Sequence, residues 1–293
     1  MKSLYISLLS LFVLYSCNTA DPRADGYGNF EAADVVLSSQ SSGKILDLYL
    51  KEGDKAYKGD TIAIIDTTDI VIRMEALDLQ LKVDDTKITR LYVEASKTRD
   101  ALKTNEKDQN RIHTLYNKKV ATETQKDQID LKVSNFKKTL QQLNLEVKSL
   151  QQHKESINNQ LSLMNNHLSH CFIVSPIDAT VLNRYKEPAE FVIPSNPIYK
   201  IASLDPLLLR IYISGAELSK VKLGQDVKVS YDHEGKLKKV TGTVAWISDQ
   251  AEFTPKTIQT REERVAQVYA VKIRVPNAKG EMKIGMPGEL HLN

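Results

Sequence analysis

The chain of 293 residues has few bulky aromatic side chains, with six Phe and one Trp, and only two cysteines. The shortage of Phe and Trp argues against one large aromatic core, while the many Leu, Ile, Val, Lys, Gln and Asn residues favour a chain rich in solvated helix. A formal net charge of +3 is too small to indicate a nucleic-acid-binding protein. A chain of this length can form one large domain or about two to four modest ones.

Motifs of the common enzyme active sites are also missing. The sequence contains no Ser-x-x-Lys, no Gly-x-Ser-x-Gly, no glycine-rich phosphate loop and no His-Glu-x-x-His. The histidines are scattered, except for His167 and His170 next to Cys171, where two imidazoles on one helix face could offer a metal site. Polar residues at a helix end are the simpler interpretation, because no further His or Cys follows before His233. We therefore expect no enzyme, no cofactor and no metal site.

Long hydrophobic runs are absent after the N-terminus, so we expect no membrane-spanning segment in the mature chain. Residues 1–16 have the pattern of an export signal, with Lys2 before an apolar stretch. They end in Leu14-Tyr15-Ser16 before Cys17, which resembles the box of bacterial lipoproteins. Cleavage after Ser16 would leave Cys17 as the first residue, and its acyl chains would anchor the protein to a membrane. The alternative is a plain secretory signal with an incidental cysteine.

Cys171 is the only other cysteine, so lipid attachment at Cys17 would leave it without a partner for an intramolecular disulfide. We expect Cys171 to be a small residue that enters a strand. Residues 17–29 contain Asp, Pro and Gly and are expected to form a flexible tether.

Glycine and proline are absent from residues 69–170, where apolar residues recur at alternating intervals of four and three. This spacing is typical of the seam of a coiled coil. The first series contains Ile70, Met74, Leu77, Leu81, Asp84, Ile88, Leu91, Ala95, Thr98, Leu102, Asn105, Gln109, Ile112 and Tyr116. The second contains Ile129, Val133, Phe136, Leu140, Leu143, Val147, Leu150, Lys154, Ile157, Leu161, Met164 and Leu168.

The two series predict an antiparallel α-hairpin with its tip at about residues 115–123. Between them Thr122 can cap a new helix, and Gln125 completes the spacing of a capping box. Two arms of about 47 residues, at about 1.5 Å per residue, give a rod about 70 Å long. The polar seam positions should weaken the packing but can fix its register; they are Asp84, Thr98, Asn105 and Gln109.

The segments that flank the hairpin are similar to each other. Gly43 to Asp66 and Ala179 to Ala202 align without a gap, and each reads as two short strands with tight turns. We expect residues 43–68 and 171–203 to form the two halves of one flattened β-sandwich, the plan of lipoyl and biotinyl carrier domains. A carrier presents its modified lysine at the turn between the halves, and the hairpin occupies that place here, so we do not expect a carrier.

The remaining strands predict a small β-barrel. Its first strand is expected within residues 30–42, around Val35 to Leu37, and the others within residues 204–293. These later strands are expected around Leu207 to Ile213, Gln225 to Tyr231, Leu237 to Ile247, Val265 to Val275 and Met286 to Leu292. We expect a rudimentary or absent membrane-proximal domain after the barrel. The predicted fold class is thus mixed α and β and elongated, with an antiparallel coiled-coil α-hairpin inserted in a split lipoyl/biotinyl-like β-sandwich.

This arrangement, behind a lipoprotein signal, resembles the periplasmic adaptors, the membrane fusion proteins of the HlyD family. Ser175 to Val181 is similar to the family's Ala-Pro-x-x-Gly-x-Val, with Ala179 in place of Gly, and Ala189 replaces another glycine of the family. At both alanines we expect turns with negative φ. Further resemblances lie in the barrel segments Ala216 to Val229 and Val268 to Leu290, and in Ala251 to Arg264, which is similar to the branch paired with ABC-type exporters.

The resemblance also implies a partner site at the tip of the hairpin. The family carries an Arg, a Leu four residues later and a Ser or Thr seven further on, which meet the outer-membrane channel. Arg111, Leu115 and Thr122 stand at these spacings. Arg111 and Leu115 lie one turn apart on one helix face, where they can offer a bidentate donor and an apolar knob. The alternative is a solvated arginine and a capping threonine.

The implied function is a non-enzymatic adaptor between an inner-membrane exporter, most simply of the ABC type, and a TolC-like outer-membrane channel. The resemblance further implies self-assembly into a hexamer or similar ring and a periplasmic location, with a lipid anchor in the inner membrane of a Gram-negative bacterium. Asn18 leaves open whether the anchor lies in the inner or the outer membrane. The alternatives are an adaptor of a proton-driven RND-type pump and a structural coiled-coil lipoprotein without a transporter.

Overall fold

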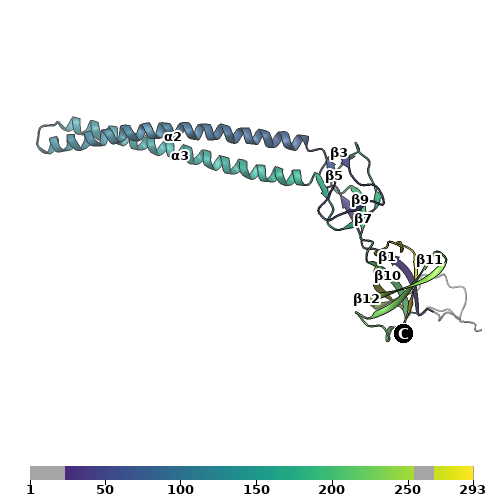
Figure 1. Ribbon diagram of the computed structural model, residues 1–293. Helices are drawn as coiled ribbons and strands as arrows, with labels where there is room; N and C mark the ends of the chain where they lie inside the picture. Colours follow the sequence, from purple (N-terminus) through teal and green to yellow (C-terminus); the bar gives the residue numbers. More distant parts are fainter. Residues whose placement is uncertain (1–23, 254–266, 293) are drawn as a thin grey trace, which may run out of the picture.

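The computed structural model describes residues 24–253 and 267–292. The molecule is elongated, with a long helical hairpin, a small β-sandwich and a β-barrel following one another along its length (Figure 1). The predicted fold class is therefore confirmed. Cys17, the expected signal of residues 1–16 and residues 254–264 of the predicted ABC-related segment lie outside the described residues. Among the described residues, no helix is both long and apolar enough to cross a membrane.

The hairpin consists of α2 (Thr68–Asn117) and α3 (Glu123–Ser169). Every position of the two predicted seams is buried or partly buried. The fully buried members are Asp84, Ile88, Leu91, Ala95 and Leu102 in α2, and Val133, Leu143, Val147 and Ile157 in α3. With 50 and 47 residues, the helices run about 70 Å. The predicted coiled-coil seam is thus confirmed, and most of this helical stability comes from the packed seam rather than from propensity alone.

The sandwich consists of two four-stranded sheets, ordered β2-β9-β7-β4 and β6-β5-β3-β8. The strands are β2 (Asp34–Ser38), β3 (Gly43–Leu48), β4 (Lys55–Ala56), β5 (Thr61–Ile65), β6 (Phe172–Val174), β7 (Ala179–Arg184), β8 (Phe191–Val192) and β9 (Pro197–Ala202). Strands β2 to β5 precede the hairpin and β6 to β9 follow it. Each sheet therefore takes strands from both sides of the hairpin, and neither half can close the sandwich alone.

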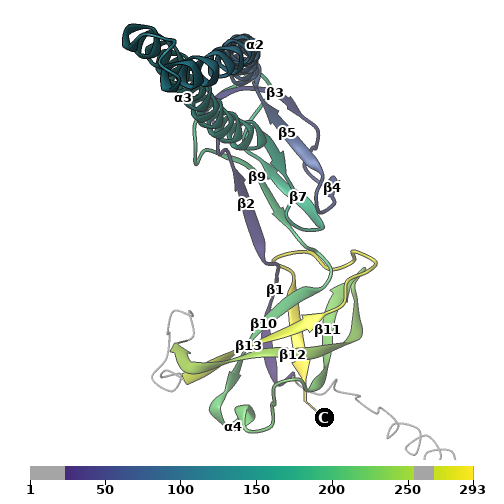
Figure 2. The same ribbon diagram turned by 90° about the vertical axis from the view of Figure 1, so that its left-hand side faces the viewer.

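The internal repeat is reproduced strand by strand. Strand β3 begins at Gly43 and β7 at Ala179, an offset of 136 residues. The same offset separates β4 from β8 and the start of β5 from the start of β9. Both arms of the hairpin leave this small domain, as Figure 2 shows, so the sandwich fixes the base from which the rod extends.

The barrel closes in the order β1-β10-β13-β12-β11-β14. Its strands are β1 (Gly26–Glu31), β10 (Leu207–Ser214), β11 (Asp226–His233), β12 (Lys236–Phe253), β13 (Gln267–Val275) and β14 (Pro287–His291), with the short helix α4 (Gly215–Leu218) after β10. Strand β10 alternates buried and half-buried residues along its whole length. Such alternation places one face of the strand in the barrel core.

The predicted first strand of the barrel is wrong. Val35 to Leu37 belong to β2, which pairs with β9 of the sandwich through Val35 opposite Ile201. The barrel instead begins with β1, in a segment assigned to the tether because of its glycines. Glycine is needed there because β1 and β10 approach each other closely. A Cβ atom on Gly28 would lie 1.8 Å from the carbonyl oxygen of Arg210.

The predicted negative φ at Ala189 is also wrong. Ala189 has a φ of +74°, as does Ser195, and the repeat-related glycines Gly53 and Gly59 have φ of +91° and +94°. The second half thus keeps the turn geometry of the first without its glycines. Equivalent hydrogen bonds hold both turns in this conformation. The Ala189 N–H donates to the Ile45 carbonyl, and the Gly53 N–H donates to the Val181 carbonyl.

We predict that Ala189→Gly stabilises the sandwich by about 1 kcal/mol, because an L residue at positive φ carries steric strain that exceeds the entropy cost of glycine. The matched control is Gly53→Ala at the equivalent turn, where a Cβ atom would meet no atom within 4 Å. This change should destabilise by a similar amount through backbone strain alone. Denaturant unfolding followed by hydrogen exchange of β3 and β7 measures both, and a destabilising Ala189→Gly would contradict the explanation.

Candidate partner-binding surface at the hairpin tip

The tip of the hairpin is a short, hydrogen-bonded turn. Helix α2 ends at Asn117 and α3 begins at Glu123. The carbonyl of Leu115 accepts hydrogen bonds from the N–H groups of Val120 and Ala121, at 2.9 and 3.4 Å. These contacts fold residues 118–121 back on the last turn of α2 and limit the conformations open to the loop.

The capping box predicted at the start of α3 is confirmed. The Gln125 N–H donates to Thr122 Oγ1 at 3.2 Å, and the Thr122 N–H donates to Gln125 Oε1 at 2.9 Å. The Thr122 hydroxyl oxygen is therefore engaged in holding the helix end, which is the structural alternative considered for this residue.

The structure brings all three predicted site residues to the tip. The Arg111 side chain is 70% exposed, and its guanidinium pairs with Asp108 one turn earlier at 3.0 Å. Leu115 lies one turn later in α2 and is half-buried, while Thr122 caps the facing helix. An exposed ion pair of this kind contributes little to stability, so the guanidinium is available to a partner.

A polar network beneath these residues ties the two arms together. Asp130 of α3 accepts a hydrogen bond from Gln109 Nε2 of α2 at 2.6 Å, and it lies 2.7 Å from His113 Nε2. Lys126, one turn earlier in α3, pairs with it at 3.2 Å. The bond from Gln109, followed by those from His113 and Lys126, lowers the pKa of Asp130 to about 2 against the opposing effect of desolvation.

We predict a pH dependence of the tip from Asp130. Its pKa lies below the ordinary 3.8, so the fold favours the carboxylate; the resulting stability is present above about pH 4 and is lost as the pH falls toward 2. Hydrogen exchange at residues 105–130 should accelerate across this window. In Asp130→Asn, whose amide keeps the size but does not titrate, the acceleration should be much smaller. Equal acceleration in both proteins would contradict the assignment.

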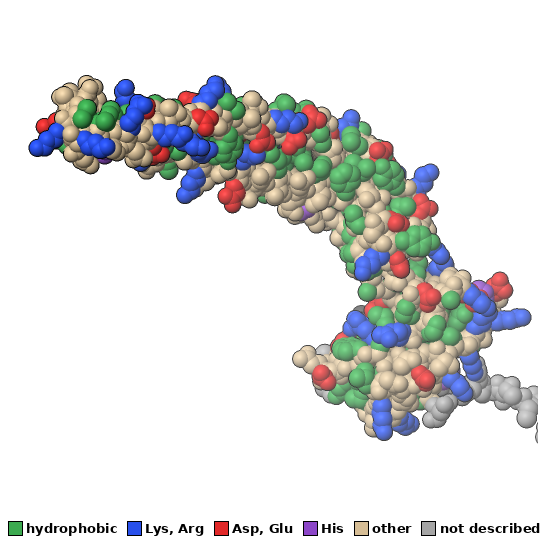
Figure 3. Space-filling model, turned by 60° about the vertical axis from the view of Figure 1, so that its left-hand side comes forward, with side chains coloured by type: hydrophobic (Ala, Val, Ile, Leu, Met, Phe, Trp, Pro, Cys, Tyr) green, Lys and Arg blue, Asp and Glu red, His purple; other side chains and the backbone are tan. Residues whose placement is uncertain are grey.

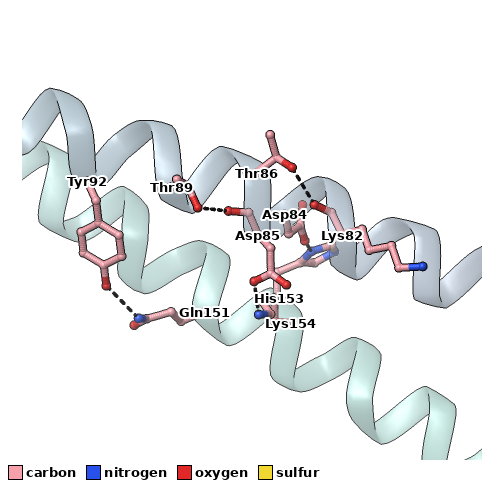
Figure 4. A network of polar contacts seen from close by, with 9 residues as sticks. All are labelled: Lys82, Asp84, Asp85, Thr86, Thr89, Tyr92, Gln151, His153 and Lys154. Atoms are coloured by element: carbon pink, nitrogen blue, oxygen red, sulfur yellow. Dashed lines mark hydrogen bonds and ion pairs between the residues drawn. The ribbon is translucent and has the colours of Figure 1, made fainter.

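A second network crosses the seam near the base of the hairpin (Figure 4). The buried carboxylate of Asp84 lies 2.6 Å from His153 Nδ1 on the facing helix and 3.3 Å from Lys87 Nζ. The hydrogen bond with His153 is the main reason that the pKa of Asp84 is lowered. Asp85 pairs with Lys154 alongside it. A buried polar seam residue with a partner across the seam disfavours shifted alignments of the two helices.

Two of the four polar seam residues of α2 reach the facing helix. Asp84 and Gln109 contact α3, as described, whereas Thr98 and Asn105 bond to carbonyls of their own helix, those of Glu94 and Ala101. The proposed role in register therefore applies to Asp84 and Gln109.

Sequence reasoning missed one exposed apolar residue at the tip. Val120 is 71% exposed between Lys119 and Ala121. The available signal was a branched aliphatic residue directly after two lysines in the connection between the two helices. Together with Arg111 and Leu115 it gives the tip a cationic group and two aliphatic groups, a combination suited to binding the end of another helical protein.

His167, His170 and Cys171 are the residues that the sequence offered as a possible metal site. In the described part of the chain, no group of three or more His, Cys, Asp or Glu side chains is placed to hold an ion. Cys171 is fully buried, and its thiol lies 3.4 Å from Ser41 Oγ and 3.6 Å from the carbonyl of His167.

Solved structures with this architecture include MacA and the membrane fusion protein Spr0693. MacA from Actinobacillus actinomycetemcomitans is 24% identical and superposes with a TM-score of 0.59, covering 90% of this chain and 76% of that one. The membrane fusion protein Spr0693 from Streptococcus pneumoniae R6 is 16% identical with the same TM-score, covering 91% and 98%. The chain therefore has the fold of the membrane fusion proteins, and the resemblance predicted from its sequence is confirmed.

Curated relatives carry the description UPF0194 membrane protein. One from Acidithiobacillus ferridurans is 28% identical over 91% of this chain and 86% of its own length. One from Yersinia pseudotuberculosis is 32% identical over 41% of this chain, an alignment that spans only 37% of the relative. No protein-family profile matches the chain.

Proposed function

We propose that this protein is a non-enzymatic periplasmic adaptor that connects an inner-membrane exporter with a TolC-like outer-membrane channel. The observation that carries the proposal is the hairpin, a rod of about 70 Å that ends in an exposed Arg111 and Val120 and is fixed at its base by the sandwich. The fold it shares with MacA and Spr0693 supports the same interpretation. Arg111 and Leu115 contact the channel, and Thr122 shapes the end of α3 that the channel meets.

The barrel and a lipid on Cys17 hold the adaptor at the inner membrane in this proposal. An ABC-type exporter is favoured by the similarity of Ala251 to Arg264 to that branch of the family. A proton-driven RND-type pump is the alternative partner, and a structural lipoprotein without a transporter is the alternative function.

Repeat-related apolar residues on the surface of the sandwich support assembly of several copies into a ring. A closed ring joins one face of each subunit to a different face of the next. The sandwich offers such faces, because positions 136 residues apart expose apolar side chains in both halves. These pairs are Val36 with Phe172, Tyr49 with Tyr185, and Tyr57 with Ile193, with exposures between 37% and 60%.

Purification of the tagged protein from cross-linked cell envelopes, followed by mass spectrometry, tests the proposal. We expect an inner-membrane exporter with a Walker-type ATPase and an outer-membrane channel to be recovered together. A large proton-driven permease in place of the ATPase would favour the alternative partner. Recovery of neither a transporter nor a channel would contradict the adaptor function. The mass of the N-terminal peptide in the same sample tests lipid attachment at Cys17.

A further inference from the structure

The two most exposed large hydrophobic side chains among the described residues lie at opposite ends of the molecule. Val120 and Leu223 are each 71% exposed. Val120 is at the tip of the hairpin, and Leu223 follows α4 at the end of the barrel that points away from the sandwich (Figure 2). Leu223 thus places an aliphatic side chain in contact with water at that end of the barrel.

A rigid turn presents Leu223. The Gln225 N–H donates to the Lys222 carbonyl at 3.1 Å, and the Lys222 N–H donates to Gln225 Oε1 at 2.9 Å. Gly224, with a φ of +81°, donates its N–H to the Val244 carbonyl at 2.9 Å. Val221, only 6% exposed, anchors the same segment in the barrel core. Leu223 lies at the second position of this turn and is 71% exposed.

Lysines surround this apolar tip. Lys220 and Lys222 are exposed on either side of Val221, and Lys or Arg side chains project from this end of the barrel in Figure 3. Two carboxylates nearby are held by neutral groups and keep their charge, since Glu217 caps α4 through Ser214 and Asp226 accepts a hydrogen bond from the Thr243 hydroxyl. An aliphatic tip flanked by lysines matches the apolar and anionic layers of a phospholipid surface.

The chain enters the fold at the same end. The Asp25 N–H donates to the Leu290 carbonyl, and the Leu292 N–H donates to Asp25 Oδ2, at 2.9 and 2.7 Å. Strand β14 lies between β1 and β11 and places His291 beside Lys228, close to the start of β11. Residues 18–24 separate Cys17 from the barrel, and seven residues span at most about 25 Å. A lipid on Cys17 would thus keep this end of the barrel near the bilayer.

We propose that the segment from Lys220 to Gln225 is a membrane-surface contact, in which Leu223 enters the headgroup layer of the anionic bilayer that holds the lipid anchor. Lys220 and Lys222 lie against its phosphates. The inference rests on the lipid attachment at Cys17 proposed above, but not on the exporter or the channel. The acyl chains supply the attachment, and this second contact orients the long axis of the molecule away from the membrane.

Site-directed fluorescence on the full, acylated chain tests this contact. Leu223→Cys would carry an environment-sensitive label, because Cys17 is acylated and Cys171 is fully buried. The protein is reconstituted in phosphatidylcholine vesicles with and without phosphatidylglycerol. We expect a blue-shifted emission and several-fold stronger quenching by a headgroup-level lipid quencher in the anionic vesicles. Lys220→Glu with Lys222→Glu should reduce this quenching to the level of the neutral vesicles.

Two matched positions serve as controls. Val120→Cys has the same native exposure but lies at the hairpin tip, and Leu237→Cys, 51% exposed between Lys236 and Lys238, lies at the opposite end of the barrel. Neither label should be quenched by the lipid. Equal quenching at 223 and 237 would overturn the proposal. So would a label at 223 that is shielded in native inner-membrane vesicles but not in vesicles of the extracted lipid, because that result indicates a protein partner.

The outcome is independent of the export function, since the vesicles contain neither exporter nor channel. A negative result therefore leaves the adaptor proposal standing, and a positive result does not require it. An N-terminal peptide without acyl groups would remove the argument from chain length and would count against the contact.

Discussion

Arg111→Glu should abolish the recovery of the outer-membrane channel with this protein, while the helical content and the thermal unfolding of the hairpin stay unchanged. The guanidinium is 70% exposed, and the one ion pair described for it is with the partly buried Asp108 of its own helix. An exposed ion pair between residues three apart stabilises a helix by about 0.2–0.5 kcal/mol, so its loss cannot unfold a coiled coil of this length. The reversed charge, however, would face the acceptors that a bidentate arginine is suited to bind.

The matched control is Arg99→Glu, an equally simple charge reversal at an exposed position of α2, three turns before Arg111. Co-purification with the channel should remain normal in this variant. Normal recovery of the channel with Arg111→Glu, or equal loss in both variants, would contradict the assignment of Arg111.

Tyr199→Ala should destabilise the sandwich by about 3–5 kcal/mol, the usual range for removing a buried aromatic side chain. Tyr199 is fully buried in β9, in the half that follows the hairpin. Its hydroxyl donates a hydrogen bond to the carbonyl of Leu50 at 2.9 Å. Leu50 lies in the half that precedes the hairpin. The substitution therefore removes core volume and also a hydrogen bond that joins the two halves across more than a hundred residues of sequence.

Hydrogen exchange of the amides in β3, β5, β7 and β9 measures the effect on this domain separately from the hairpin and the barrel, whose unfolding need not coincide with it. Both halves should lose protection together. Tyr57→Ala, at a side chain that is 60% exposed on the same sandwich, should change the stability by no more than about 0.5 kcal/mol. Loss of protection in β7 and β9 alone would show that the halves do not form one cooperative unit.

The parts of the fold that follow from repeated spacing could be predicted from the sequence. The seam of α2 and α3 is a local periodicity, and every predicted seam residue is buried or partly buried. The two halves of the sandwich share a repeat, so the second half could be assigned from the first. The cap at Thr122 depends on two residues three apart, which is also local information.

The sequence-based predictions were wrong at positions where contacts with distant parts of the chain determine the backbone conformation. Glycines in β1 indicated a linker, but Gly28 permits β10 to approach closely. Alanine at position 189 indicated negative φ, but the hydrogen bond from its N–H to Ile45 requires the turn of its glycine counterpart. Local residue preference was outweighed in both cases by contacts with residues far along the chain.

The candidate site could likewise be predicted only where the information is local in the sequence. The spacing of Arg111, Leu115 and Thr122 placed them at the tip, where the structure has them, and their contact with a channel stays a prediction. The network around Asp130 could not be predicted, because its bond to Gln109 joins residues on opposite arms and depends on the register of the two helices.

Photo-cross-linking from Val120 in living cells tests the central claim most directly. A photoreactive residue at this position, at the exposed end of the rod, should cross-link to an outer-membrane channel protein, and the same residue at Tyr92, 53% exposed on α2 near the middle of the hairpin, should not. Cross-links from position 120 to the channel would show that the rod bridges the periplasm. Cross-links from position 120 only to inner-membrane proteins, or to no other protein, would contradict the adaptor function.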